Sequence, residues 1–406
     1  MELVVDNDAL SLSKGYKQTE VGLIPSDWEY VTIKQLIDNG LIEKPLDGNH
    51  GNIHPKSSDF TDSGIPFIMA NNIFAGKLNF SDCHFIRKEQ ADKLQKGFSI
   101  NGDVLLTHKG TVGNVAIVDN ITTDYIMLTP QVTYYRVKDK SIISNLYIKQ
   151  FFEGGIFQSI LLNISGGGTR AYIGIIGQQG LPFILPPFKE QTAIATALSD
   201  ADALISSLEK LIAKKRNIKQ GAMQKLLQPK EGWEVKKLGE IVEKITTGKL
   251  DANAANENGA YRFYTCAKNY FFINEYAFDD EALLVSGNGE NVGYVHYYKG
   301  RFNAYQRTYV ITGFNQNIHF VKIYLDRYLP ERIDSEVNSG NTPYIKMGTL
   351  TDMRISLPDM REQTRIATIL SDMDAEIAAL ETKLEKYRKI KLGMMQNLLT
   401  GKIRLI

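Results

Sequence analysis

The chain has 406 residues, of which 43% are hydrophobic and 23% are charged, and its 47 basic and 46 acidic residues leave a formal net charge of +1. It contains no apolar run near the roughly 20 residues that cross a bilayer, which excludes a membrane protein. The N-terminus has no basic segment leading into an apolar stretch, so we expect no secretory signal and a cytoplasmic protein. Cys83 and Cys266 lie far apart without a CxxC pattern, which argues against a disulfide framework and against a structural zinc site.

A first domain is predicted over residues 25–185, after an N-terminal tail of residues 1–24. The domain opens with DWEYVTIKQLID at Asp27 and continues in short runs of Val, Ile, Tyr and Phe broken by Gly, Asn and Asp. Such runs are typical of strands and turns, with a few short helices between them. Pro186 and Pro187 mark the end of the last extended segment, just before a helix begins.

A long helix is predicted next, over residues 186–228. Its apolar positions alternate in steps of four and three, which is the heptad pattern of a helix–helix seam. At 1.5 Å per residue, a helix of about 37 residues is roughly 55 Å long, too long for the core of a small domain. The seam residues are Ile194, Leu198, Ala201, Ile205, Leu208 and Ile212.

A second domain, residues 229–357, repeats the order of the first. It opens with GWEVKKLGEIVE at Gly232, a phrase related to the opening of the first domain. Three later phrases correspond in order: GDVLLTHKGTVG to EALLVSGNGENVG, PQVTYYRV to YQRTYVIT, and SGGGTRAYIG to NSGNTPYIKMG. The repeated punctuation predicts that both domains have related folds.

The last predicted element, residues 358–406, is a second long helix with a C-terminal tail. Residues 190–228 align without gaps on residues 362–400, and about 23 of the 39 positions are identical, which indicates a duplication. One helix carries the chain away from the first domain and the other returns it, so we predict an antiparallel coiled coil. The second seam consists of Ile366, Leu370, Met373, Ile377, Leu380 and Leu384.

The predicted fold class is α+β, with two related domains of mixed strands and short helices. Two long repeated helices separate these domains, which a pseudo-two-fold axis would relate. A plain structural coiled coil that only holds the chain together is one interpretation. A second interpretation is that the two related domains, held apart by a stiff spacer, bind a duplex target with two half-sites. The spacing of the domains would then set the spacing of the half-sites.

Four phrases, GYKQTEVGLIPSDWE, LPPFKEQTAIATALSDAD, GWEVKKLGEI and MMQNLLTGKIRLI, closely resemble the specificity subunit of type I restriction–modification systems. The resemblance covers the chain from Gly15 onward. It implies that each domain is a target-recognition domain for one half of a bipartite, asymmetric site in double-stranded DNA, and that the helices act as a ruler. It also implies two methyltransferase subunits as partners, and restriction subunits in the full complex.

The same resemblance implies that this chain has no catalytic centre and no cofactor of its own. S-adenosylmethionine would serve the N6-adenine methyltransferase subunits, and ATP and Mg²⁺ are likewise expected in partner subunits. The recognition domains of this family differ most between members, so we choose candidate DNA contacts on physical grounds.

In the first domain, Lys109 and Thr111 lie in the Gly-bounded loop THKGTVG, where the backbone can approach a phosphate closely. Gln131 and Arg136 carry the donors and acceptors that read adenine and guanine edges. Further candidates are Asn49, His50 and Lys56 in a polar loop, and Thr169 and Arg170 after a Gly triplet that could form an anion-binding nest.

The repeat extends these predictions to the second domain. Its candidates are Asn288, Asn291, Gln306, Arg307, Asn341, Thr342 and Lys346. Each candidate in either domain is also typical of a turn or of a solvated surface. The prediction of a DNA contact therefore rests on the group of candidates in each domain rather than on any single residue.

Four patterns point to other chemistry, and we weigh each. His50 and His54 have the helical spacing of some metal sites, but the surrounding Gly and Pro predict a loop, and no third ligand follows. LPPF resembles the amine-binding motif of amino-methyltransferases, yet Leu185 cannot accept a hydrogen bond from an amino group. Glu234-Val235-Lys236 matches half of a nuclease motif without its partner, and no GxxxxGK(S/T) is present. We therefore predict a non-catalytic chain without a metal.

A second hypothesis is a two-headed scaffold that binds proteins and has no DNA role. The near-neutral net charge favours it, because a stand-alone DNA reader is commonly basic. Salt dependence discriminates the two hypotheses, since a DNA reader loses affinity steeply as counterions compete.

Overall fold

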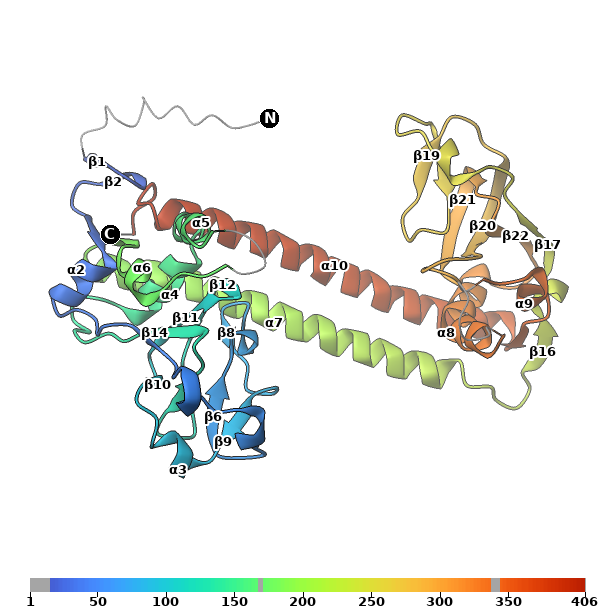
Figure 1. The fold of residues 1–406 in the computed structure, drawn as a ribbon. Helices are drawn as coiled ribbons and strands as arrows, with labels where there is room; N and C mark the ends of the chain where they lie inside the picture. Colours follow the sequence, from blue (N-terminus) through green and yellow to red (C-terminus); the bar gives the residue numbers. More distant parts are fainter. Residues whose placement is uncertain (1–14, 167–170, 337–343, 406) are drawn as a thin grey trace. The chain divides into compact units, whose positions relative to one another are not determined.

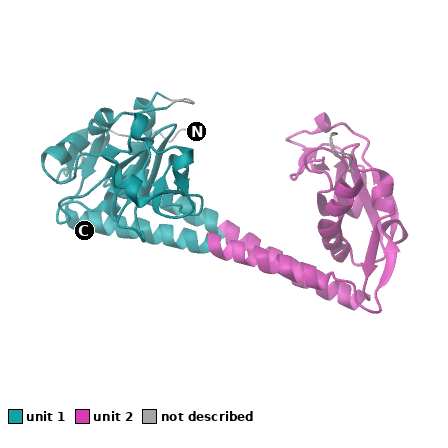
Figure 2. Ribbon diagram, turned by 60° about the horizontal axis from the view of Figure 1, so that its bottom comes forward, with its two compact units in different colours: residues 1–208, 383–406 teal, residues 209–382 magenta. Residues whose placement is uncertain are grey.

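The computed structural model describes residues 15–166, 171–336 and 344–405 (Figure 1). The chain divides into unit 1, residues 1–208 and 383–406, and unit 2, residues 209–382 (Figure 2). Two long helices, α7 (Phe188–Leu226) and α10 (Met360–Leu398), each contribute one part to either unit. None of the helices in the described part of the chain has the length and apolar character that a membrane crossing requires.

Unit 1 contains two main sheets. Their strand orders are β10-β13-β6-β9-β5 and β12-β11-β14-β4. The strands of the first are β5 (Phe60–Thr61), β6 (Ile65–Ile68), β9 (His84–Ile86), β10 (Phe98–Ser99) and β13 (Ile126–Leu128). Those of the second are β4 (Leu46–Asp47), β11 (Val104–Lys109), β12 (Thr111–Ile117) and β14 (Val132–Tyr135). β11 is buried from Val104 to His108, and only Lys109 at its end is exposed. This burial explains the apolar start of its sequence, VLLTHK.

Short strand pairs and helices complete unit 1. The pairs are β1 (Tyr16–Thr19) with β2 (Gly22–Pro25), β3 (Glu29–Thr32) with β15 (Pro182–Leu185), and β7 (Ile73–Phe74) with β8 (Lys77–Leu78). The helices are α2 (Ile33–Asp38), α3 (Lys88–Ala91), α4 (Asn145–Glu153), α5 (Gly155–Ile164) and α6 (Ile175–Gln179). Short 3-10 helices cover Gly51–Ile53, Ser57–Asp59 and Ala70–Asn72.

The prediction of an N-terminal tail over residues 1–24 is wrong for its last part. Residues 16–25 form the antiparallel β1–β2 hairpin, in which Lys17 faces Ile24. Ile24 is buried in the main core of unit 1, and the hydroxyl of Tyr16 donates to the carbonyl of Gly401 at 2.8 Å. This segment is therefore ordered by apolar burial and by contact with the segment after α10.

The main core of unit 1 joins both long helices to the domain. Ile194 and Leu198 of α7 and Leu398 of α10 belong to the same buried cluster as Trp28. The indole of Trp28 donates to Glu190 at 2.9 Å. Arg404 donates to the same carboxylate at 2.7 and 2.8 Å, and also to Asp27 at 2.8 Å.

Unit 2 is built on a six-stranded sheet with the strand order β17-β22-β20-β21-β18-β19. Its strands are β17 (Val242–Thr247), β18 (Tyr261–Tyr264), β19 (Phe271–Ile273), β20 (Phe278–Ser286), β21 (Val295–Ala304) and β22 (Thr308–Phe314). Helix α8 (Ile318–Glu336) packs on one face, where Phe320 and Leu325 meet Leu283 and Ile311. The opposite face carries a smaller cluster around Tyr264 and Phe302.

The remaining elements of unit 2 connect this sheet to the long helices. They are β16 (Glu234–Lys237) paired with β23 (Arg354–Leu357), α9 (Met347–Thr351), and 3-10 helices at Leu238–Glu240 and Ala252–Ala254. The cluster under α8 also contains Leu227, Ile366 and Leu370, so the ends of α7 and α10 are part of this core.

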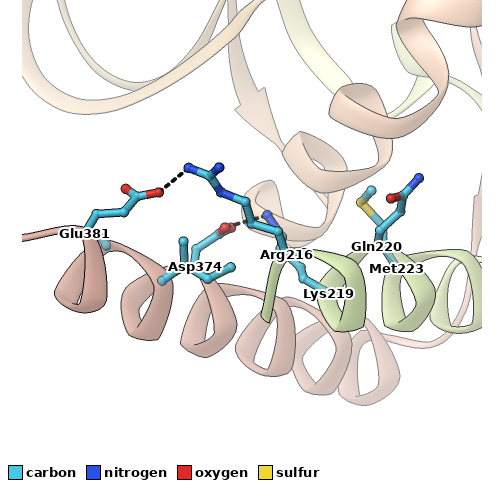
Figure 3. A pocket seen from close by; sticks show the side chains of 8 residues that line it. Arg216, Lys219, Gln220, Met223, Asp374 and Glu381 are labelled. Atoms are coloured by element: carbon cyan, nitrogen blue, oxygen red, sulfur yellow. Dashed lines mark hydrogen bonds and ion pairs between the residues drawn. The ribbon is translucent and has the colours of Figure 1, made fainter. Parts of the chain in front are cut away.

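Within each unit, the segments of α7 and α10 lie side by side and run in opposite directions. In unit 2, Arg216 pairs with Glu381 at 2.5 Å, whereas Lys219, one turn further along α7, pairs with Asp374 at 2.5 Å (Figure 3). These pairs border an open hollow of about 520 Å³. In unit 1, Lys391 of α10 pairs with Asp202 of α7 at 2.6 Å.

The predicted seam positions are buried or half-buried, and those nearest the domains belong to the domain cores. Ile194, Leu198, Leu208, Ile212, Ile366, Leu370, Ile377 and Leu384 are buried, and Ala201, Ile205, Met373 and Leu380 are half-buried. Apolar burial along one stripe, with ion pairs at its border, is the arrangement that a heptad pattern favours.

Candidate nucleic-acid interface

Lys109 and Thr111 lie at the tip of the β11–β12 hairpin in unit 1. The two residues face each other across Gly110, whose φ of +79° is a conformation that side-chain-bearing residues rarely adopt. The amide of Gly110 donates to the carbonyl of Ala171 at 3.0 Å, which fixes the tip against a neighbouring segment. Both candidate side chains are exposed.

Gln131 lies beside this tip, although 22 residues separate it from Lys109. Its carbonyl accepts a hydrogen bond from the amide of His108 at 2.9 Å, and its side chain is exposed. A hollow of about 280 Å³ is lined by His54, Met69, Lys109, Thr129, Pro130 and Gln131. The structure thus brings together a cation, an amide and an imidazole, groups that contact phosphates and base edges.

Tyr172 is an exposed aromatic residue at the same tip. Its backbone forms a bridge with Lys109, its side chain is 53% exposed, and its ring lies 5.9 Å from that of His108. We did not predict Tyr172 as a site residue. The correspondence between TRAYIG and NTPYIKMG was the available signal, because it gives each domain a Tyr at the same place.

A buried carboxylate organises the loop that contains His50. Asp47 is 4% exposed and accepts hydrogen bonds from Lys96 and, at 2.7 Å, from Nε2 of His50. His108 donates through Nδ1 to the carbonyl of Ile173 at 3.0 Å, and its Nε2 lies 3.9 Å from Asp47. Burial lowers the pKa of His108, so its ring is neutral at pH 7.

Asn49 is not available for a DNA contact in this structure. It is 2% exposed, its amide donates to the carbonyl of Lys96 at 2.6 Å, and its side-chain oxygen accepts from the amide of Gln95 at 3.0 Å. Its role is to tie two loops together. His50 and Lys56 remain on the surface, and the backbone of Lys56 is fixed by Asp59 at 2.7 Å.

Arg136 is likewise directed into the protein. Its guanidinium donates to both oxygens of Asp103 at 2.9 and 2.8 Å and to the carbonyl of Phe98 at 2.8 Å. Asp103 is 1% exposed and needs this cation, because a buried carboxylate without a partner is costly. These bonds occupy the donors that a base contact would need, which argues against the predicted role.

Unit 2 repeats the tip geometry of unit 1. The amide of Ile345 donates to the carbonyl of Gly287 at 2.9 Å, as the amide of Ile173 does to His108 at 3.0 Å. The backbone of Asn288 forms a bridge with Tyr344, as Lys109 does with Tyr172. Tyr344 is 53% exposed, the same value as its counterpart.

The other candidates of unit 2 gather around this tip. Asn291 donates to the carbonyl of Cys266 at 3.2 Å, and Gln306 donates to Asp251 at 2.6 Å. Arg307 and Lys346 have exposed side chains. Gly287 permits this arrangement, because a Cβ there would lie 2.3 Å from the carbonyl oxygen of Arg307. Thr169, Arg170, Asn341 and Thr342 lie outside the described residues.

The patterns weighed against catalysis have structural explanations. In LPPF, Leu185 is the buried last residue of β15, and the two prolines lead into α7. Glu234 and Lys236 pair with each other at 2.8 Å on the surface of β16. No cluster of His, Cys, Asp and Glu that could hold a metal ion occurs among the residues that the structure describes.

The sequence and fold of the chain can be compared with those of known proteins. The family described as type I restriction modification DNA specificity domain matches residues 25–220 and 230–388. The chain belongs to this family. Its members are the non-catalytic specificity component of type I restriction–modification systems.

Two relatives illustrate the extent of similarity to this specificity family. The type I restriction enzyme EcoDI specificity subunit from Escherichia coli is 40% identical over 168 residues, which are 41% of this chain and 37% of that protein. The type I restriction enzyme MjaIX specificity subunit from Methanocaldococcus jannaschii is 24% identical over 445 residues and 96% of either chain.

A solved structure shows the same fold. The S subunit of a type I restriction–modification system from M. genitalium matches with a TM-score of 0.62 and 17% identity, over 91% of this chain and 96% of the other. The similarity therefore extends over both domains and both long helices.

Proposed function

We propose that this chain is the DNA-reading subunit of a type I restriction–modification complex. Each domain would read one half of a bipartite, asymmetric site in double-stranded DNA with the tip described above. The observation that carries this proposal is the repeated tip, where exposed polar side chains and an exposed Tyr stand on a fixed backbone in both units. Phosphate contacts from the tips would fix register, and contacts to base edges would choose sequence.

Residues 25–185 and 229–357 would be the two target-recognition domains, and residues 186–228 and 358–406 the segments with the spacer helices. We infer that α7 and α10 form an antiparallel coiled coil and that a pseudo-two-fold axis relates the domains. The inward-facing stripes and the bordering ion pairs in each unit support this arrangement. Such a spacer would set the distance between the half-sites on the duplex.

The partners we propose are two N6-adenine methyltransferase subunits and, in the full complex, restriction subunits, all in the cytoplasm. Flipping and methylating the adenine would be the task of the methyltransferase, with its own S-adenosylmethionine. ATP and Mg²⁺ would likewise serve the partners. Exposed Leu211 and Ile218, seven residues apart on α7 of unit 2, offer an apolar stripe on which a partner helix could pack.

The test is single-molecule methylation profiling of the host genome with the gene intact and deleted. The proposal expects the deletion to remove one N6-methyladenine motif that consists of two short half-sites around a fixed unspecified spacer. If the profile were unchanged, DNA binding by the purified complex would be measured next. Absence of any salt-dependent DNA affinity in that complex would favour the protein-binding scaffold and contradict our proposal.

A further inference from the structure

Arg262 on β18 is held between two aromatic rings. Its guanidinium carbon lies 4.3 Å from the ring centroid of Tyr270 and 4.5 Å from that of Tyr298. One nitrogen donates to the hydroxyl of Tyr264 at 3.4 Å. Stacking of this kind fixes the plane of a guanidinium and leaves its N–H edge available for a planar or tetrahedral anion.

No carboxylate forms an ion pair with Arg262 among the residues that the structure describes. Arg301 on the neighbouring strand β21 provides the contrast. Its guanidinium also lies over a tyrosine, Tyr276, at 4.8 Å, but it pairs with Asp279 at 3.0 Å. The charge of Arg301 is therefore neutralised within the domain, whereas that of Arg262 is not.

The two arginines project from opposite faces of the sheet. Arg262 shares its face with Tyr264, Tyr298 and Phe302, whose rings contact one another. Arg301 is adjacent to Phe302 along β21, so its side chain alternates to the face on which α8 packs. The aromatic face thus carries the arginine that forms no ion pair within the described part of the chain.

Contacts through the segment after β18 connect this aromatic face to the tip of unit 2. The segment after β18 contains Cys266, whose carbonyl accepts from Asn291 at 3.2 Å and whose Sγ contacts the carbonyl of Arg307 at 3.5 Å. Next to it, His296 donates to the carbonyl of Ala267 at 2.9 Å, and its ring lies 5.0 Å from that of Tyr264. A chain of contacts therefore connects the candidate base-reading residues to Tyr264, the hydrogen-bond partner of Arg262.

We propose that Arg262 binds a backbone phosphate next to the half-site that the second domain reads, and that Tyr270 and Tyr298 hold it in place for this contact. The inference rests on the proposed DNA-reading function and assigns one phosphate contact within it. A phosphate suits the position because a fixed guanidinium edge can donate two parallel hydrogen bonds to its oxygens. An unpaired cation beside a DNA-reading tip also complements the charge of the duplex.

The experiment compares full-length Arg262→Ala, Arg262→Lys and Arg301→Ala with the parent chain, each in complex with the methyltransferase subunits. Fluorescence anisotropy measures affinity for two duplexes over a range of salt concentrations. One duplex carries the motif that methylation profiling identifies, and the other carries the same motif with its second half-site scrambled. Arg262→Ala is expected to reduce the slope of log affinity against log salt by about 0.9, the value for one phosphate. It should weaken binding to both duplexes by roughly tenfold.

The other variants are matched controls. Arg262→Lys keeps the charge and should keep the salt slope, and Arg301→Ala should bind like the parent. Thermal unfolding of each complex checks that the domain remains folded. A parental slope in a folded Arg262→Ala complex would refute the phosphate contact, and so would a loss confined to the intact second half-site. Absence of DNA binding by the parent complex would instead refute the proposed function, and the phosphate contact with it.

Discussion

At the scale of single residues, the tip of unit 1 carries one residue suited to a phosphate contact and one suited to a base contact. Lys109 carries a charge and suits a phosphate, whereas Gln131 has the donor and acceptor pair that reads adenine. Both line the same hollow, so their effects can be compared in one domain.

We predict that Gln131→Ala relaxes sequence preference at one position of the first half-site, with a loss of discrimination of about 1–3 kcal/mol. Lys109→Ala should weaken binding to all duplexes alike and lower the salt slope by about 0.9. Binding to a panel of single-base variants of the half-site measures both effects, with exposed Lys138→Ala as the control. Equal losses on every duplex for Gln131→Ala would contradict its role in base reading.

Arg136 is expected to act on stability rather than on recognition. Arg136→Ala leaves the buried carboxylate of Asp103 without its cation, which should lower the free energy of unfolding by about 3 kcal/mol. Urea denaturation of the full chain measures this loss. The salt slope of DNA binding by the folded fraction should stay at the parental value, and a lower slope would restore Arg136 as a DNA contact.

His108 predicts a pH dependence of stability. Burial holds its pKa in the folded chain below the ordinary value of about 6.5, so below pH 6.5 the unfolded chain takes up a proton that the folded chain does not. The free energy of unfolding should therefore fall as the pH drops from 7.5 through 6.5 toward the folded pKa. His108→Asn preserves a donor for Ile173 and should show a smaller fall between pH 7.5 and 5.5 in denaturant titrations. Equal falls in both proteins would contradict this assignment.

At the scale of elements, α7 and α10 were predictable because their signal is local and repeated. Heptad spacing and a gapless alignment of 39 residues need no knowledge of distant contacts. The strands around Val104 and Leu284 could likewise be predicted from apolar runs that an acidic residue precedes and a glycine follows. The partnership of Arg136 with Asp103 could not, because 33 residues separate them and no local pattern encodes the contact.

We predict that shortening both helices by one heptad shortens the spacer of the DNA site. Removing residues 211–217 from α7 and residues 376–382 from α10 takes out about 10.5 Å of helix, or about three base pairs of duplex. Both half-site sequences should be retained. Methylation profiling of a host that carries the variant measures the two half-sites and the spacer length. Removal from α7 alone is the control, and it should abolish methylation because the two seams no longer match. An unchanged spacer would contradict the ruler.

At the scale of the whole molecule, each domain has its own core, strand order and tip. We predict that replacing residues 229–357 by the second domain of another family member exchanges one half-site and leaves the other half-site and the spacer as they were. Methylation profiling measures each half-site and the spacer independently. A change in both half-sites would mean that the domains do not read DNA separately.

The candidate site was predictable only in outline. Sequence comparison between the halves located both tips, since glycines and polar residues recur in order. It did not find Tyr172, Tyr344 or the sandwich around Arg262, because exposure and stacking depend on segments that meet only in the folded chain. For the same reason it included Asn49, whose polar side chain is occupied inside unit 1.

Arg404 ties the segment after α10 to the start of α7 in unit 1. Its guanidinium neutralises Glu190, which is 4% exposed at the start of α7 and also receives the indole of Trp28. A nonsense mutation at codon 404 would remove this guanidinium and leave the carboxylate without its cation in the core of unit 1. Truncation at this codon should therefore behave as a loss-of-function allele, although both tips would be translated intact.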